Sequence, residues 1–88
     1  MNLKNAQPLI SICVPTYNRS ESLRSLFEVL LTVKKAHRDI VEVCVSNNCS
    51  TDDTANVIAE WRDLLDIKDI TQDENIGAMR NCVAVTSI

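Results

Sequence analysis

The chain has 88 residues, enough for one small domain, and its 45% of apolar residues is usual for a globular protein. A net charge of -3 without a basic stripe disfavours nucleic acid as a partner. Four cysteines without a CxxC pair, beside a single histidine, disfavour a zinc site. We see neither an apolar leader segment nor an apolar run of membrane-spanning length, and we expect a cytoplasmic protein.

The first third of the chain predicts a polar tail, a strand and a helix. Residues 1–8 are expected to form the tail. The apolar, β-branched run at 9–14 predicts a strand that Pro15 ends, and near-continuous apolarity is typical of a strand covered on both faces. The segment 20–35 predicts an amphipathic helix. The apolar positions of this helix are Leu23, Leu26, Phe27, Leu30 and Leu31.

A second strand and helix are predicted from the middle of the chain. The run IVEVCV at 40–45 predicts the strand. Ser50 and Asp53 then match a capping box, which opens a helix that runs to about Leu64. Within this helix we expect Trp61 to pack in the core.

The last part of the chain predicts a weaker strand at 67–71 and a helix that starts near Ala78 and is still helix-like at Ile88. The whole order is β-α-β-α-β-α. Such alternation predicts an α/β fold, with a three-layer, Rossmann-like parallel sheet and right-handed crossovers.

Each predicted strand runs into a polar loop, and the three loops lie at 15–19, 46–50 and 72–77. Because the carboxyl ends of parallel strands meet at one edge of the sheet, these loops should surround one crevice. That arrangement indicates a small-molecule site, with a nucleotide as the leading candidate. Gly77 is the only glycine, which excludes the glycine-rich dinucleotide and phosphate-loop motifs. Side chains and helix N-termini would therefore hold the ligand.

Three segments resemble motifs of the family 2 glycosyltransferases, which have the GT-A fold. ISICVPTYNR at 10–19 resembles the opening strand and loop, and VSNNCSTDDT at 45–54 resembles the second motif. ENIG at 74–77, with Asn81 four residues on, resembles the third. Order and spacing match across about residues 9–83. The resemblance implies that residues 9–88 form the N-terminal, nucleotide-binding half of a GT-A domain.

The resemblance also implies the residues that contact the nucleotide. These are Pro15, Thr16, Tyr17, Asn48 and Asn75, and we add Arg19 and Arg80 as the only cations next to the predicted crevice. Tyr17 is expected to stack on the base, although it can equally be an exposed loop aromatic. Asn48 is expected in an exposed position where it contacts the base, and its alternative role is an Asx-turn. Arg80 is expected near the diphosphate, and its alternative is a solvated helix face.

The second motif departs from many members of the family, because Asn47 and Asn48 stand where those members have aspartates. An asparagine side chain donates as well as accepts hydrogen bonds, whereas a carboxylate only accepts. Asn18 and Ser50 are interpreted mainly as helix caps. Asp52, with the next aspartate, is interpreted as a first-turn helix charge and not as a catalytic acid.

The resemblance implies transfer of a sugar from a nucleoside-diphosphate sugar, of the UDP or dTDP type, to a glycan or lipid-linked acceptor. It implies a role in polysaccharide biosynthesis, in the cytoplasm or at the cytoplasmic face of the membrane. The Mg²⁺ or Mn²⁺ of the family is bound by a DxD-type motif that would follow residue 88, as would the catalytic base. We therefore expect these residues to hold no metal and no catalytic group of their own. We also expect an open sheet edge that favours homo-oligomers.

Two other classes remain open from the sequence. One is a non-catalytic module that binds a nucleotide or a protein partner. The other is a nucleotidyltransferase, which would normally carry a glycine-rich, basic loop after its first strand, and residues 15–19 contain no glycine.

Overall fold

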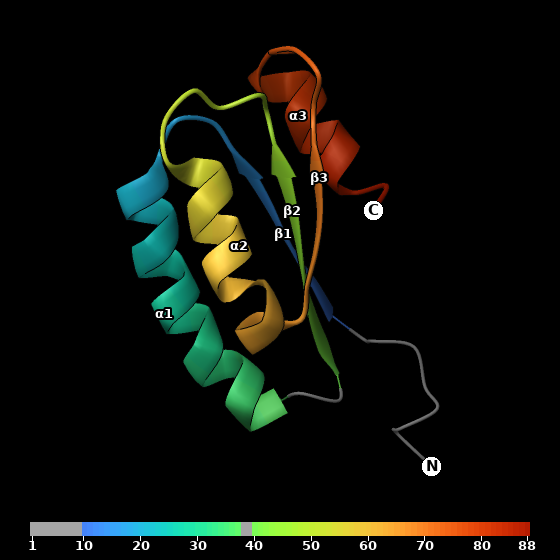
Figure 1. Ribbon diagram of the computed structural model, residues 1–88. Coiled ribbons are helices and arrows are strands. Elements are labelled where there is room, and N and C mark those ends of the chain that lie inside the picture. The colour runs from blue at the N-terminus through green and yellow to red at the C-terminus, as the bar shows by residue number, and fades with distance from the viewer. Residues whose placement is uncertain (1–9, 38–39) are drawn as a thin grey trace.

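The computed structural model describes residues 10–37 and 40–88, so the predicted tail at 1–8 lies outside the described residues. The elements alternate along the chain as β1 (Ile10–Thr16), α1 (Ser20–His37), β2 (Val41–Asn47), α2 (Thr54–Leu65), β3 (Ile67–Thr71) and α3 (Ala78–Val85). The strands form a parallel sheet in the order β1-β2-β3 (Figure 1). The predicted α/β fold with a parallel sheet is confirmed.

The sheet is covered on both faces, which gives three layers. Helices α1 and α2 lie side by side on one face (Figure 1). Helix α3 packs against β1 and β2 from the other face, where Ser46 of β2 bonds to Asn81 of α3. Two right-handed crossovers in the same direction place α1 and α2 on the same face. The chain crosses to the opposite face only after β3.

The main core lies between the sheet and the pair α1 and α2. Its buried members are Val14, Leu23, Phe27, Leu30, Val43, Val45, Val57, Ile58, Leu65 and Ile67. Trp61 is half-buried against this core, with its ring centroid 6.1 Å from that of Phe27. The predicted packing role of Trp61 is confirmed. Because the core is almost wholly aliphatic, this ring pair is its main aromatic contact.

Strand β1 does not end where the sequence predicted. It continues through Pro15 to Thr16, and Pro15 lies opposite Ser46 in the parallel register. The prediction that Pro15 ends the strand was therefore wrong. The physical reason is that β1 is an edge strand within the described sheet, and a proline is tolerated on an edge.

Two helix ends also differ from the prediction. Helix α2 begins at Thr54, and Asp53 in the N-cap position makes no side-chain capping bond, so the predicted capping box does not form. Helix α3 ends at Val85 and does not continue to Ile88. After it, the hydroxyl of Thr86 donates to the carbonyl of Val83 over 2.6 Å. None of the helices in the described ranges is long and apolar enough to cross a membrane.

Phe27→Ala tests the core directly. The Phe27 side chain is 0% exposed, and its truncation should cost about 3–5 kcal/mol. Whole domains of this length have roughly 4–13 kcal/mol of stability, so much of the folded population should be lost. Thermal and urea unfolding followed by circular dichroism measure the change. Val29→Ala on the same helix is the control, because Val29 is 62% exposed. Equal losses in the two variants would contradict this core.

Candidate functional site

A hollow of about 390 Å³ lies at the carboxyl ends of the strands, in the size range of ligand pockets. Its lining residues are Pro15, Thr16, Tyr17, Arg19, Asn48, Asn75, Gly77, Ala78, Asn81 and Cys82. Every residue that the sequence predicted for the site is among them except Arg80, which the structure does not place in the lining. The three loops therefore meet at one hollow, as the strand order requires.

Four lining residues were not predicted as site residues. Gly77 and Asn81 belong to the third motif, so a sequence signal for them existed. Ala78 and Cys82 enter the lining because one face of α3 borders the hollow. Small side chains on a short helix carry no chemical pattern that could have marked these two in advance.

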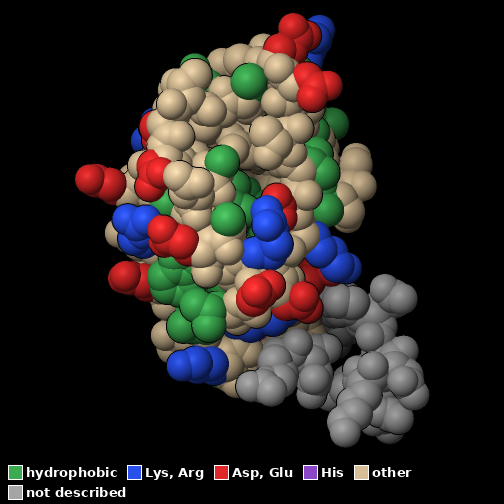
Figure 2. Space-filling model, in the orientation of Figure 1, with side chains coloured by type: hydrophobic (Ala, Val, Ile, Leu, Met, Phe, Trp, Pro, Cys, Tyr) green, Lys and Arg blue, Asp and Glu red, His purple; other side chains and the backbone are tan. Residues whose placement is uncertain are grey.

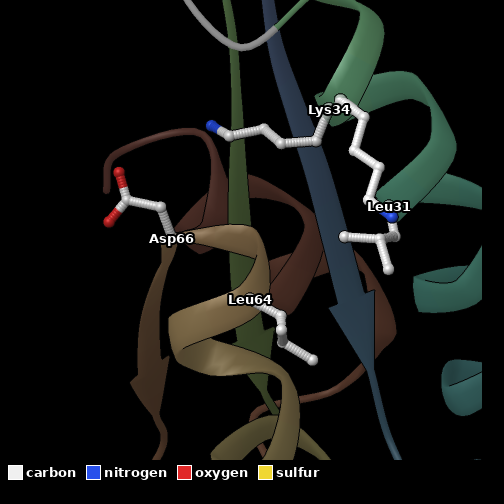
Figure 3. A pocket seen from close by; sticks show the side chains of 5 residues that line it. Leu31, Lys34, Leu64 and Asp66 are labelled. Atoms are coloured by element: carbon white, nitrogen blue, oxygen red, sulfur yellow. The ribbon is translucent and has the colours of Figure 1, made fainter.

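A second hollow, of about 460 Å³, lies at the other end of the molecule between the last turns of α1 and α2. Figure 3 shows Leu31 and Lys34 of α1 across from Leu64 and Asp66. The ammonium of Lys34 donates to the carbonyl of Val41 over 2.6 Å, so this lysine is engaged within the fold. None of the three motif loops reaches this hollow, and we do not assign it a ligand.

Asn48 is 2% exposed, which corrects the expectation of an exposed loop position. Its Nδ2 donates to Asn75 Oδ1 over 2.9 Å, and its Oδ1 accepts from the backbone N–H of Ile76 over 2.8 Å. Its own backbone N–H donates to the carbonyl of Thr16 over 2.9 Å. Asn48 thus joins the loop after β2 to the strand end of β1 and to the loop after β3.

The loop between β3 and α3 is shaped by Asn75 and Gly77. The Gly77 N–H donates to Asn75 Oδ1 over 2.8 Å. Gly77 has φ +87, a conformation that side chains with a Cβ rarely adopt. This turn leads into α3 and turns the Asn75 side chain toward Asn48.

Asn18 joins the first loop to the second. Its Oδ1 accepts from the backbone N–H groups of Thr51 and Asp52, over 2.7 and 3.2 Å. Its backbone N–H donates to Ser50 Oγ over 3.0 Å. Asn18 has φ 48, in the left-handed region that asparagine tolerates better than most residues. The side chain therefore bridges two loops and does not cap α1.

Ser50 and Asn47 fix the second loop from within. Asn47 is 1% exposed, and its Oδ1 accepts from the Ser50 N–H over 3.1 Å and from the Ser50 hydroxyl over 2.6 Å. This is a side-chain turn of the kind that asparagine favours. Ser50 thus closes its own loop and does not cap α2, contrary to the interpretation from sequence.

Asp52 serves two helix N-termini with one carboxylate. Oδ2 accepts from the Ser20 N–H at the start of α1 over 3.2 Å. Oδ1 accepts from the Thr54 N–H over 3.0 Å and from the Thr54 hydroxyl at the start of α2. The hydrogen bond from the Thr54 hydroxyl is the main reason that the pKa of Asp52 lies below its usual value. The negative charge also suits the positive ends of both helices.

Asn81 holds α3 against β2. Its Oδ1 accepts from the Ser46 hydroxyl over 2.6 Å, and its Nδ2 donates to the Ser46 carbonyl over 2.9 Å. The amide of Gln72 also donates to the Ser46 hydroxyl over 3.2 Å. Ser46 is 0% and Asn81 2% exposed, so these polar groups are buried and satisfied by one another.

Tyr17 and Arg19 supply an aromatic ring and a cation at the rim of the hollow. Tyr17 is 41% exposed, and Arg19 takes part in none of the ion pairs of the described residues. These three ion pairs, one of which joins Arg62 to Asp69, involve none of the residues that line the hollow. On the face turned to the viewer, Figure 2 shows acidic and basic side chains interspersed.

The described residues do not form a metal site. Within 10–37 and 40–88, no group of three or more His, Cys, Asp or Glu side chains is placed to hold an ion. Asp52 does not line the hollow, and its carboxylate is engaged by both helix N-termini. The residues present therefore do not fit the metal that the resemblance implies.

Residues 11–87 match the family model of glycosyl transferase family 2, and the chain belongs to this family. It is 40% identical over 82 residues to the abequosyltransferase RfbV of Salmonella typhimurium strain LT2. That match covers 91% of this chain and 24% of the relative. A validoxylamine A glucosyltransferase of Streptomyces hygroscopicus subsp. jinggangensis is 39% identical over 77 residues, which cover 84% of this chain and 18% of that protein.

Solved structures share the fold. Residues 1–349 of S. aureus TarS align with a TM-score of 0.72 at 28% identity, over 89% of this chain and 23% of that chain. The mannosyltransferase PcManGT from Pyrobaculum calidifontis, solved with GDP-Man and Mn2+, aligns with a TM-score of 0.67 at 23% identity. That alignment covers 92% of this chain and 25% of PcManGT. The chain thus spans about a quarter or less of the length of these relatives. The prediction of a GT-A fold is confirmed.

Asp52→Asn tests the shared cap. The substitution replaces one carboxylate oxygen by an NH₂ group, which faces a backbone donor at Ser20 or Thr54. We expect the melting temperature to fall at neutral pH, because one helix N-terminus loses its acceptor and both lose the nearby negative charge. Asp63→Asn, at an exposed position of α2, is the charge-matched control.

The pH dependence of the melting temperature should further distinguish Asp52→Asn from the parent. Because the folded state lowers the pKa of Asp52 from 3.8, its stabilisation is complete above that pH and is lost as the pH falls through the lower folded value. The difference in melting temperature between the parent and Asp52→Asn should therefore shrink as the pH falls below about 4. A difference that stays constant down to pH 2 would contradict the assignment.

Proposed function

We propose that the complete protein transfers a sugar from a nucleoside-diphosphate sugar, of the UDP or dTDP type, to a glycan or lipid-linked acceptor. The observation that supports this is the hollow at the carboxyl ends of the strands. Its lining combines residues from all three family motifs in a chain that belongs to glycosyl transferase family 2. Residues 10–88 would supply the nucleotide-binding part of that transferase.

The proposed binding mode uses groups that the fold leaves open. Tyr17 presents an exposed aromatic ring on which a base can stack. Asn48 borders the hollow with one amide hydrogen and one carbonyl lone pair beyond those used in its two side-chain bonds. Thr16 and Pro15 form the wall at the end of β1, and the Arg19 guanidinium offsets negative charge on the phosphates. Asn75 also borders the hollow.

Two predicted features depend on parts of the protein outside these residues. We propose Mg²⁺ or Mn²⁺ for the complete protein, in keeping with the PcManGT structure in complex with Mn2+. Arg80 remains a proposed diphosphate contact. Because it lies outside the lining of the hollow, this contact would depend on parts of the protein outside these residues. We propose polysaccharide biosynthesis in the cytoplasm, or at the cytoplasmic membrane face, as the setting.

Tyr17→Ala tests the base-stacking proposal. Loss of one base–aromatic stack should weaken UDP binding by about 1–3 kcal/mol, or roughly fivefold to 150-fold. The melting temperature should change little, because the side chain is 41% exposed. Titration calorimetry of the full protein with UDP, and with dTDP in parallel, measures the affinity. Leu64→Ala is the control, since Leu64 is 61% exposed and lines the other hollow. Unchanged binding by Tyr17→Ala, or equal weakening by Leu64→Ala, would count against this site.

The open edge of β1 supports a second proposal, self-association of residues 1–88. An edge strand presents unpaired backbone groups, and Leu26 and Val29 of α1 are also exposed, by 38% and 62%. We expect light scattering to show a dimer or larger species at millimolar concentration. Val29→Lys should shift the equilibrium toward the monomer. A parent that stays monomeric at millimolar concentration would refute the proposal.

A further inference from the structure

We propose that Asn75 is a positioning residue that fixes which way the Asn48 amide points, and that these two asparagines work only as a donor–acceptor pair. This inference rests on the proposed function for its consequence in binding. The pairing itself is a property of the loops after β2 and β3 and can be tested without a ligand. Asn75 would then act on the nucleotide through Asn48 and not by its own carbonyl.

Two backbone N–H groups set the orientation of both amides. The Gly77 N–H can only donate, so the Asn75 atom that it meets at 2.8 Å must be the carbonyl oxygen. The Ile76 N–H imposes the same choice on Asn48, whose Oδ1 lies 2.8 Å away. The remaining contact, Asn48 Nδ2 to Asn75 Oδ1 at 2.9 Å, is then a donor facing an acceptor. Reversal of either amide would place two donors or two acceptors against each other.

The same bonds determine what each side chain can still offer. Asn75 Oδ1 receives two donors, from Gly77 and Asn48, which fill its two lone pairs. Asn48 keeps one N–H and one lone pair, and it is 2% exposed at the wall of the hollow. A buried N–H without an acceptor is rare in proteins, so this hydrogen is the one that a bound ligand would satisfy.

We expect the two isosteric variants Asn75→Asp and Asn48→Asp to differ in stability. Asn75→Asp keeps an acceptor where Asn48 Nδ2 and the Gly77 N–H both donate, so the contacts survive. Asn48→Asp places a carboxylate oxygen against Asn75 Oδ1, and relief by rotation of the Asn75 amide would cost the Gly77 bond. Both variants add one negative charge to the same cluster. We expect Asn48→Asp to melt several degrees below the parent at pH 7.5 and Asn75→Asp to melt close to it.

Acidification should change the stability of the two variants, relative to the parent, in opposite directions. A protonated Asp at position 48 donates to Asn75 Oδ1 and still accepts from Ile76, which restores the pattern of the amide. Its folded pKa should therefore be raised above about 3.9, and the stability of this variant relative to the parent should rise as the pH falls toward 5. An Asp at position 75 accepts two hydrogen bonds, so its folded pKa should be lowered. Its relative stability should stay constant to about pH 4 and fall below that.

Other ionisable groups near the pair are common to both variants. Tyr17 and Arg19 from the first loop and Cys82 from α3 line the hollow, and Asp73 and Glu74 precede Asn75 in its loop. These groups are the same in the two proteins. The difference between Asn48→Asp and Asn75→Asp at each pH therefore isolates the effect of which side of the pair carries the carboxyl.

The experiment measures the melting temperature of the parent and both variants in the full protein from pH 7.5 to pH 3, without ligand and then with UDP. The proposal expects the opposite pH trends without ligand, and at least fivefold weaker UDP binding by Asn48→Asp at pH 7.5 that recovers at pH 5. Equal melting temperatures, or parallel pH trends, would overturn the pairing. Opposite trends with no UDP binding by the parent would leave the pairing intact, remove its role in binding and refute the proposed function instead.

Discussion

Side-chain amides that satisfy backbone N–H groups of a neighbouring loop hold the end of this sheet together. A strand that stops at a crevice leaves backbone donors that no ladder can satisfy. Asn18 accepts from two such donors in the second loop, and Asn48 accepts from one in the third. Asp52 does the same for the first turns of α1 and α2. These bonds fix three loops relative to one another in a chain with one glycine. The hollow is consequently bordered by loops that contacts within the fold hold in place.

These hydrogen bonds between loops explain why the motif residues are largely buried or hydrogen-bonded within the fold. Asn47, Asn48 and Asn81 are each no more than 2% exposed, although they occur in segments that resemble ligand-binding motifs. These side chains mainly hold the loops and α3 in position, and of the three only Asn48 and Asn81 border the hollow. Tyr17 and Arg19, which carry no such task among the described contacts, are the groups available to touch a ligand directly. A substitution in these loops therefore needs a stability measurement beside every binding measurement.

The alternation of strands and helices could be predicted from sequence because the apolar periodicities at Leu23, Phe27 and Leu30, and in the run VEVCV, are strong. Most of the hollow could be predicted because parallel strands end at one edge. The extent of β1 could not be predicted from sequence, because Pro15 is acceptable only on an edge strand and the order of the strands is a property of the tertiary structure. The backbone partners of the Asn18 side chain lie up to 34 residues away, so a local capping pattern misassigned this residue. The place of Arg80 outside the lining could not be predicted either, since the direction of α3 over the sheet is not encoded in its own eight residues.

We propose that the three loops form one nucleotide site. The most direct measurement is a ¹H–¹⁵N chemical-shift titration of the protein with UDP, residue by residue. We predict that the amide resonances of Thr16, Tyr17, Asn48 and Asn75 shift together along one saturable curve, while those of Leu31 and Leu64 at the other hollow stay fixed. Shifts confined to the hollow near Leu64, or none at millimolar UDP, would contradict it.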